Sequence, residues 1–369
     1  MISTPAAPLA VATPSATAVR RAATRIRALL VALGGASLIG GLDAALVRLD
    51  VWAPVISTRV GDVHGQVMVL GFLGTLSLER AQSLGRTWAY LAPALYGAGA
   101  VALVSPAPVL LGQLLQVEAG VLFVGLYLAL WLRAPRPLVA VQVLAAVLAL
   151  GGAVVALLVD VPHAIAWFAG FVVVTIAAER AELAALVMGP AADRRLLVLA
   201  TGLTLATLAA LLWPGGERAV GLALAALAAW LAVHDVVRRQ LRLTGQRRYL
   251  AVALLAGYVH LALAGGVLAA AGLLSGSGAY DVVVHGVFLG FGVSMVMAHA
   301  PVILPAVLGR PLPYRPALWV PLVLLNAGLA VRFTGALAGL TGLWQVGGVV
   351  TVVAVLGFVG TAATLVVRR

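Results

Sequence analysis

The chain has 369 residues, of which 63% are hydrophobic and only 10% are charged, and its mean hydropathy is +1.11. Soluble globular domains carry about 25% charged residues, so this composition excludes a soluble enzyme of one or two domains. A membrane-spanning helix needs about 20 mainly apolar residues, and the chain is long enough for many of them. The sequence therefore predicts an integral membrane protein.

Cysteine is absent, which excludes disulfides, thiolate-bound zinc, iron-sulfur clusters and covalently attached c-type heme. The net charge of +12 comes from 24 arginines against 12 acids. All but four of these arginines fall on the side of the membrane that holds both chain termini, and the exceptions are Arg48, Arg59, Arg218 and Arg332. This bias predicts a bacterial inner (cytoplasmic) membrane protein with both termini in the cytoplasm, and it implies no nucleic acid.

The apolar segments predict an all-α, polytopic protein. Residues 1–27 are expected to form a disordered cytoplasmic tail, because their first part is uncharged and rich in Pro, Ala, Ser and Thr. Residues 28–367 are expected to form a single transmembrane domain of twelve helices. The expected helices are 28–47, 61–83, 87–105, 108–132, 138–158, 162–187, 194–213, 218–237, 249–274, 281–308, 316–333 and 343–367.

A histidine lies near the outer end of the second, sixth and tenth expected helices, at His64, His163 and His285. The interval is four helices each time. This spacing predicts three pseudo-repeated four-helix units that are related by rotation about the membrane normal. An acid precedes each histidine, at Asp62, Asp160 and Asp281. These acids would either hold a ring nitrogen or simply favour a helix start, and both interpretations stay open.

Residues four and seven positions apart share one helix face, which places Met68 and Gly71 below His64, and Gly292 below His285. Imidazole within a membrane is rare and usually faces the interior of the helix bundle. Two such rings from different helices are the usual axial pair of a b-type heme, and a glycine two turns below would leave room for the macrocycle. The sequence therefore predicts heme b.

The twelve spans, the His-Gly-x-x-Met motif that begins at His64 and the outer His285 resemble subunit I of the heme-copper oxidases. The resemblance implies that His64 and His285 are axial heme ligands and that Arg332 lies near the heme propionates, where a bidentate guanidinium suits a carboxylate. Helix 194–213 has no histidine and helix 281–308 lacks a His-x-His pair, so no intact oxygen-reduction site is expected. Whether copper accompanies the heme stays open.

Helix 281–308 and the loop after it also resemble the NnrS family of twelve-span heme proteins, which is associated with denitrification and nitric oxide stress. The matching residues are His285 to Gly290, Met295 and the run Leu308-Gly309-Arg310-Pro311-Leu312. This resemblance implies a redox or nitric oxide related role, electron transfer and a redox partner protein. Whether the protein is a heme-dependent oxidoreductase is not decided by the sequence.

Three more histidines are candidate metal ligands: His163 near the outer surface, and His260 and His299 deeper in the membrane. With Glu118 the two deeper histidines would form a second metal or proton site, or they would only hydrogen-bond neighbouring helices. The alternative function is a cofactor-free transporter that uses these groups for a proton, a metal ion or a small solute. A third is a subunit with structural histidines. The basic loop 238–248 would attract anionic membrane lipid.

Overall fold

A computed structural model of the chain describes residues 16–367 except 56, 76, 190 and 309–311. The described residues are mostly helical and contain no strand, which confirms the all-α class. Eleven helices in this part of the chain are long and apolar enough to cross a membrane. Their length follows from uninterrupted runs of Ala, Leu and Val, which bury apolar surface in every direction and need no polar face.

The long helices match the expected apolar ranges in order, apart from the second. They are α1 (Ala16–Arg48), α5 (Leu91–Val104), α6 (Val109–Arg133), α7 (Pro137–Leu158), α8 (Val161–Leu183), α10 (Ala191–Leu212), α11 (Glu217–His234), α13 (Gly245–Ala271), α14 to α15 (Gly278–Leu308), α16 (Trp319–Ala338) and α17 (Thr341–Val367). Short helices join them: η2 (Thr87–Tyr90), α9 (Ala185–Met188), α12 (Val237–Gln240) and η4 (Pro316–Leu318).

The second expected helix, 61–83, is a series of short pieces. These are α2 (Thr58–Asp62), α3 (His64–Gln66), the π-helix η1 (Val67–Leu73) and α4 (Leu78–Leu84). The tenth also contains a π-helix, η3 (Gly286–Val293), between α14 (Gly278–His285) and α15 (Ser294–Leu308). π-Helices are rare and are frequent at functional sites. The two π-helices are therefore the first structural pointer to a site.

The first helix begins earlier than the sequence analysis expects. Helix α1 starts at Ala16, so residues 16–27, which were expected to belong to a disordered tail, continue the helix. Ala and Arg are strong helix formers, and no Gly or Pro separates them from the apolar run that follows. Residues 1–15 of the expected tail lie outside the described residues.

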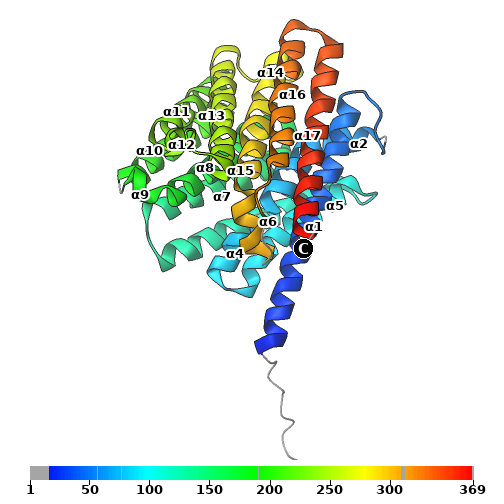
Figure 1. Cartoon of the computed structure of the whole chain (residues 1–369). Helices are drawn as coiled ribbons and strands as arrows, with labels where there is room; N and C mark the ends of the chain where they lie inside the picture. The colour runs from blue at the N-terminus through cyan, green and yellow to red at the C-terminus, as the bar shows by residue number, and fades with distance from the viewer. Residues whose placement is uncertain (1–15, 56, 76, 190, 309–311, 368–369) are drawn as a thin grey trace, which may run out of the picture.

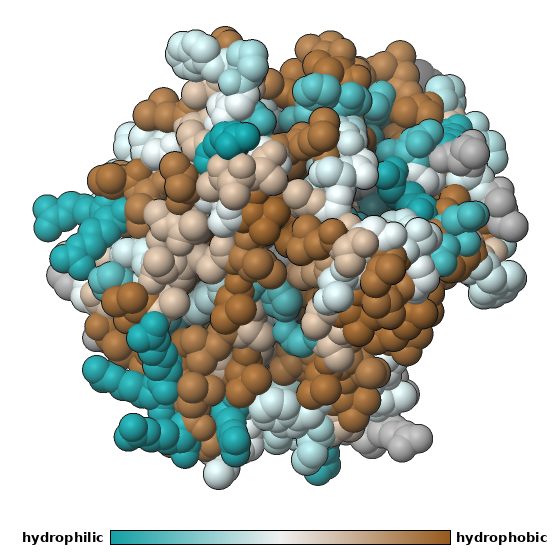
Figure 2. Space-filling model, turned by 90° about the horizontal axis from the view of Figure 1, so that it is seen from above, coloured by the Kyte–Doolittle hydropathy of each residue, from teal (hydrophilic) through white to brown (hydrophobic). Residues whose placement is uncertain are grey.

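The expected second, sixth and tenth helices meet inside the bundle. Helix α8 and the segment Gly278–Pro301 are the most buried long helices, and α8 contacts α3, η1 and η3. The start of α1 and the end of α17 lie at the same end of the bundle (Figure 1). Hydrophobic side chains cover much of the surface seen from above, with hydrophilic ones in separate groups (Figure 2). The central position of these three helices is the placement that the expected repeat requires.

Candidate functional site

A cavity lies between the two π-helices and gathers four of the predicted site residues. Its lining includes His64 and Met68 from α3 and η1, His285 from α14, and Arg332 from α16. The remaining lining is mainly apolar, with Leu42, Val69, Phe72, Ile165, Phe288, Leu289 and Val293 among its members. Residues more than 260 positions apart in the chain thus meet in one mainly apolar site.

Each of the two histidines is held in place through one of its ring nitrogens, Nδ1. Nδ1 of His64 bonds to the carbonyl oxygen of Gly41 in α1 at 2.9 Å, and Nδ1 of His285 bonds to the carbonyl oxygen of Asp281 at 3.0 Å. The Asp281 carboxylate also lies 3.2 Å from His285 Nδ1. At Nε2 of either ring the structure records no hydrogen bond from any described residue. This is the arrangement of a metal-binding imidazole, whose far nitrogen donates to an oxygen and fixes the tautomer.

Arg332 forms a bidentate ion pair beside His285. Its Nε and Nη2 donate to the two carboxylate oxygens of Asp281 at 2.8 and 2.7 Å. Trp344 of α17 donates its indole N–H to the same carboxylate at 3.1 Å, and its ring lies 5.4 Å from the Arg332 guanidinium carbon. Asp281 therefore joins α14, the helix that carries His285, to the α16–α17 pair. Nη1 of Arg332 has no recorded partner among the described residues.

Glycines bring Trp344 and Arg332 together. A Cβ atom at Gly335 would overlap the backbone nitrogen of Trp344, and one at Gly347 would overlap the backbone nitrogen of Arg332. Small residues allow membrane helices to approach this closely. The sequence analysis did not single out Trp344; the glycines in helices 316–333 and 343–367 are the only signal that would have pointed to this close packing.

Gly71 and Gly292 do not line the cavity, contrary to the expectation that they leave room below the histidines. A Cβ atom at Gly71 would meet Ala100 of α5 and, at 3.1 Å, Oγ of Ser37 in α1. At Gly292 it would come within 3.6 Å of Val172 in α8. The expectation assumed regular α-helical turns. Because the turns of η1 and η3 are wider, the position seven residues on points elsewhere.

The cavity as it stands holds about 60 Å³, which is room for a few water molecules and not for a heme. Side chains of Met68, Phe72, Phe288 and Leu289 reach into the space between the helices. The donor set is of the kind that a heme needs, because two histidines without a recorded Nε2 partner among the described residues line a mainly apolar cavity together with a guanidinium. Its entry requires these side chains to turn aside, and the unbranched Met68 is the easiest to move.

His163 lies away from this cavity. Its ring is 64% exposed at the start of α8, and Nδ1 lies 2.6 Å from Oδ1 of Asp160. Asp160 also accepts the backbone N–H of His163 at 2.8 Å, which caps α8. Burial raises the pKa of Asp160, but the two hydrogen bonds from His163 and the charge of its ring together outweigh burial, so this pKa lies below its usual value. Both interpretations of the acid hold here, since Asp160 caps the helix and holds a ring nitrogen.

His260, His299 and Glu118 are not brought together. His260 Nε2 lies 3.1 Å from Oδ1 of Asn326 in α16, and its buried Nδ1 has no partner. His299 Nδ1 bonds to the Met295 carbonyl oxygen at 2.8 Å, and Glu118 is exposed on the surface of α6. In the part of the chain that the structure describes, no group of three or more His, Cys, Asp or Glu would hold a metal ion. The expected second site therefore does not assemble from these residues.

A second buried ionic cluster lies at the other end of α8. Arg180 donates from Nε and Nη2 to both carboxylate oxygens of Asp235, at 2.9 and 2.8 Å. Tyr258 donates its hydroxyl to Asp235 at 2.5 Å, and Nε2 of His299 lies 3.1 Å from Nη1 of Arg180. Asp235 and Tyr258 lie 55 or more positions from Arg180 in the chain, so the spacing of residues in the sequence does not indicate that they are its partners.

The family model described as a domain of unknown function (DUF8744) matches residues 27–367, and the chain belongs to this family. No curated protein matches the chain.

Proposed function

We propose that this DUF8744 chain is a heme-binding protein of the bacterial inner membrane, with twelve spans and both termini in the cytoplasm. The observation that carries the proposal is that His64 and His285 line one cavity while each ring is hydrogen-bonded through Nδ1, with no hydrogen bond recorded at Nε2 among the described residues. Heme b bound there would supply a one-electron redox couple. Since two histidines would fill both axial positions, electron transfer to a partner protein fits this site better than nitric oxide binding or oxygen reduction.

The surrounding residues suit such a cofactor. Asp281 and the Gly41 carbonyl oxygen hold the two imidazoles, and the lining of the cavity is mainly apolar, as the macrocycle of a heme would need. Nη1 of Arg332 would donate a hydrogen bond to a heme propionate, while Nε and Nη2 of the same guanidinium stay bonded to Asp281. Arg332 is therefore the residue most suited to hold the polar edge of a heme.

The test is a reduced-minus-oxidised absorption spectrum, with metal analysis, on protein that is produced with ample heme and purified in detergent. We expect a stoichiometric b-type signal that is lost in His64→Ala and His285→Ala. His163→Ala is the matched control, because this histidine is exposed and outside the cavity. An unchanged spectrum in both cavity variants, with folded protein, would reject these two ligands.

A transporter is the second candidate, and a broken helix favours it. Discontinuous helices commonly form the substrate site of secondary transporters, and His64 lies at such a break, between α2 and α3, while His285 precedes the π-helix η3 within a continuous helix. In this case the Nε2 atoms would bind a proton or a small cation. Purified protein that contains neither heme nor metal, together with ion flux in proteoliposomes that His285→Ala abolishes, would establish this function instead.

A further inference from the structure

An uncompensated basic patch lies between α12 and the start of α13. The sequence contains no Asp or Glu from residue 236 to residue 280. The preceding acid, Asp235, is already bonded to Arg180 and Tyr258. The patch has five exposed arginines, for which the structure records no hydrogen bond or ion pair among the described residues: Arg238, Arg239, Arg242, Arg247 and Arg248. Their charges therefore face the surroundings of the protein and are available to an anion.

The start of α13 adds to this positive charge. Thr244 occupies the capping position, but its side chain makes no capping hydrogen bond, and the first turn contains two arginines and no acid. Unpaired N–H groups and the helix dipole make this end favourable for an anion and unfavourable for arginine. The sequence here opposes the usual charge preference of a helix start, and a bound anion would remove the conflict.

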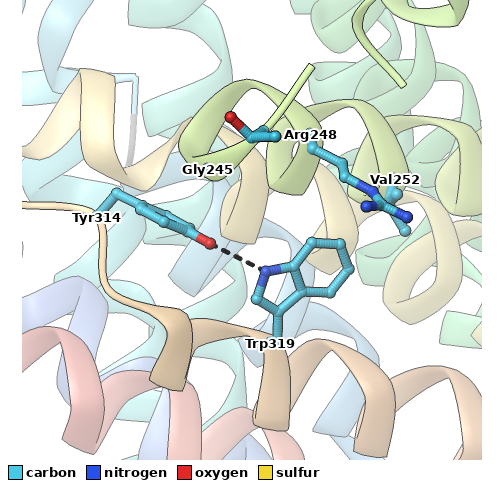
Figure 3. A pocket seen from close by; sticks show the side chains of 6 residues that line it. Gly245, Arg248, Val252, Tyr314 and Trp319 are labelled. Carbon is cyan, nitrogen blue, oxygen red and sulfur yellow. Dashed lines mark hydrogen bonds between the residues drawn. The ribbon is translucent and has the colours of Figure 1, made fainter. Parts of the chain in front are cut away.

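A cavity of about 420 Å³ lies directly beside this helix start (Figure 3). Arg248 and Thr244 line it from α13, and Tyr314 and Trp319 line it from the segment that leads into α16. Trp319 donates its indole N–H to the hydroxyl of Tyr314 at 3.1 Å, and Tyr249 packs edge-on against the Trp319 ring at 5.5 Å. The wall is thus aromatic and fixed, while the hydroxyl of Thr244 and the guanidinium of Arg248 remain uncommitted.

We propose that this cavity binds the phosphate of an anionic phospholipid headgroup at the cytoplasmic surface. The phosphate would contact Arg248, the hydroxyl of Thr244 and the free N–H groups of the first turn of α13. Val252 lines the cavity, and Val259 on α13 and Val320 and Val323 on α16 are exposed apolar side chains that would offer a path for an acyl chain. Tryptophan and tyrosine at this level are typical of the membrane interface.

A neighbouring cavity of about 590 Å³ on the other side of Thr244 is lined by Arg247 but has no aromatic side chain. The aromatic wall therefore distinguishes the proposed site from the rest of the basic patch. The proposal rests on the membrane location and is independent of heme, since none of its residues lines the cavity between the histidines.

The experiment measures the thermal stability of the full-length protein in a neutral detergent against increasing short-chain phosphatidylglycerol. Short-chain phosphatidylcholine and inorganic phosphate are titrated in parallel. We expect saturable stabilisation by phosphatidylglycerol only, with the apparent affinity lowered about tenfold in Arg248→Gln, as for a lost charge-assisted hydrogen bond. Arg239→Gln is the matched control, because it removes the same charge from the patch but lines neither cavity.

Equal losses of affinity in Arg248→Gln and Arg239→Gln would overturn the proposal, because general surface attraction would then explain the binding. Equal stabilisation by inorganic phosphate would replace the lipid by free phosphate as the ligand. No stabilisation by any of the three additives would reject the site. Arg248→Lys, which keeps the charge but not the planar fork, is expected to bind with intermediate affinity and shows that the position tolerates substitution. The heme spectrum of these variants should not change, which separates this test from that of the proposed function.

Discussion

Two clusters in the described part of the chain are built from the same kinds of side chain. In each, an arginine forms a bidentate pair with an aspartate, an aromatic side chain donates to that aspartate, and a histidine lies beside the pair. The first cluster is Arg332, Asp281, Trp344 and His285, and the second is Arg180, Asp235, Tyr258 and His299.

They differ in what the histidine does. His299 uses both ring nitrogens inside the protein, one on Arg180 and one on the Met295 carbonyl oxygen. His285 uses only Nδ1 and keeps Nε2 for the cavity. Asp235 is fully buried, whereas Asp281 is 14% exposed. A closed cluster of this kind ties helices together, and an open one holds a group in place for a ligand.

The largest expected effect is the loss of stability in Asp235→Ala. Removal of one partner leaves Arg180 as an uncompensated buried charge, which typically costs about 3–5 kcal/mol. The measurement is the free energy of unfolding by denaturant in detergent micelles. The double variant Arg180→Met, Asp235→Leu should recover most of the loss, since it removes both charges. A single variant as stable as the wild-type protein would show that the cluster does not tie the helices together.

Asp281→Ala tests the open cluster. If heme is bound as proposed, loss of the group that orients a ligating histidine should lower the heme affinity about 10- to 100-fold. Heme titration followed by absorbance measures this change. In Asp235→Ala the folded fraction should bind heme as the wild type does. Equal effects of the two substitutions on heme affinity would remove the distinction between the clusters.

Gly348→Ala perturbs only the open cluster. Its methyl group would press on Leu49 and would lie 3.0 Å from Arg332 Nη1, so overpacking should cost about 1–3 kcal/mol. Gly357→Ala on the same helix is the control, because nothing lies within 4 Å of the new Cβ atom. Thermal unfolding should separate the two variants, and equal melting temperatures would contradict the close packing of Arg332 on α17.

The smallest effect concerns Asp160, in the exposed third acid-histidine pair. Asp160→Ala removes the cap of α8 and should cost about 1 kcal/mol at neutral pH, while Asp160→Asn should keep most of the capping. Since the pKa of Asp160 is lowered in the folded protein, its contribution is present above the ordinary carboxyl pKa and is lost as the pH falls through the lowered value. The difference in melting temperature between wild type and Asp160→Ala should therefore shrink in acid. A difference that is independent of pH would argue against the ionised cap.

Long apolar runs and repeated intervals are the features of the sequence that predict where helices and site residues lie. Apolar runs located the long helices, and the interval of four helices between histidines placed His64 and His285 on helices that meet. The second helix is in pieces because Val67–Leu73 forms a π-helix and the chain turns again before α4. No rule of spacing indicates such a turn, and for this reason helical spacing does not show that Gly71 and Gly292 lie outside the lining of the cavity.

Ion pairs between residues far apart in the chain are also not predictable from the sequence. Arg80 bonds to Glu179 and, at 2.9 Å, to Glu182, and both acids lie on α8, about a hundred positions away in the chain. Glu118 lies in an apolar run like the deeper histidines, yet it is on the outer face of α6. Partner choice depends on how the helices are rotated, which hydropathy does not encode.

The close packing of α16 on α17 has a consequence for biosynthesis. Both histidine-bearing segments leave the ribosome before Arg332 and Trp344 do, and the glycines let the later two helices associate as a hairpin. Until this hairpin docks, Asp281 lacks the arginine and the indole that hold it, and His285 is correspondingly free to rotate. If a cofactor binds beside His285, its site would therefore be complete only after α16 and α17 have been synthesised and packed.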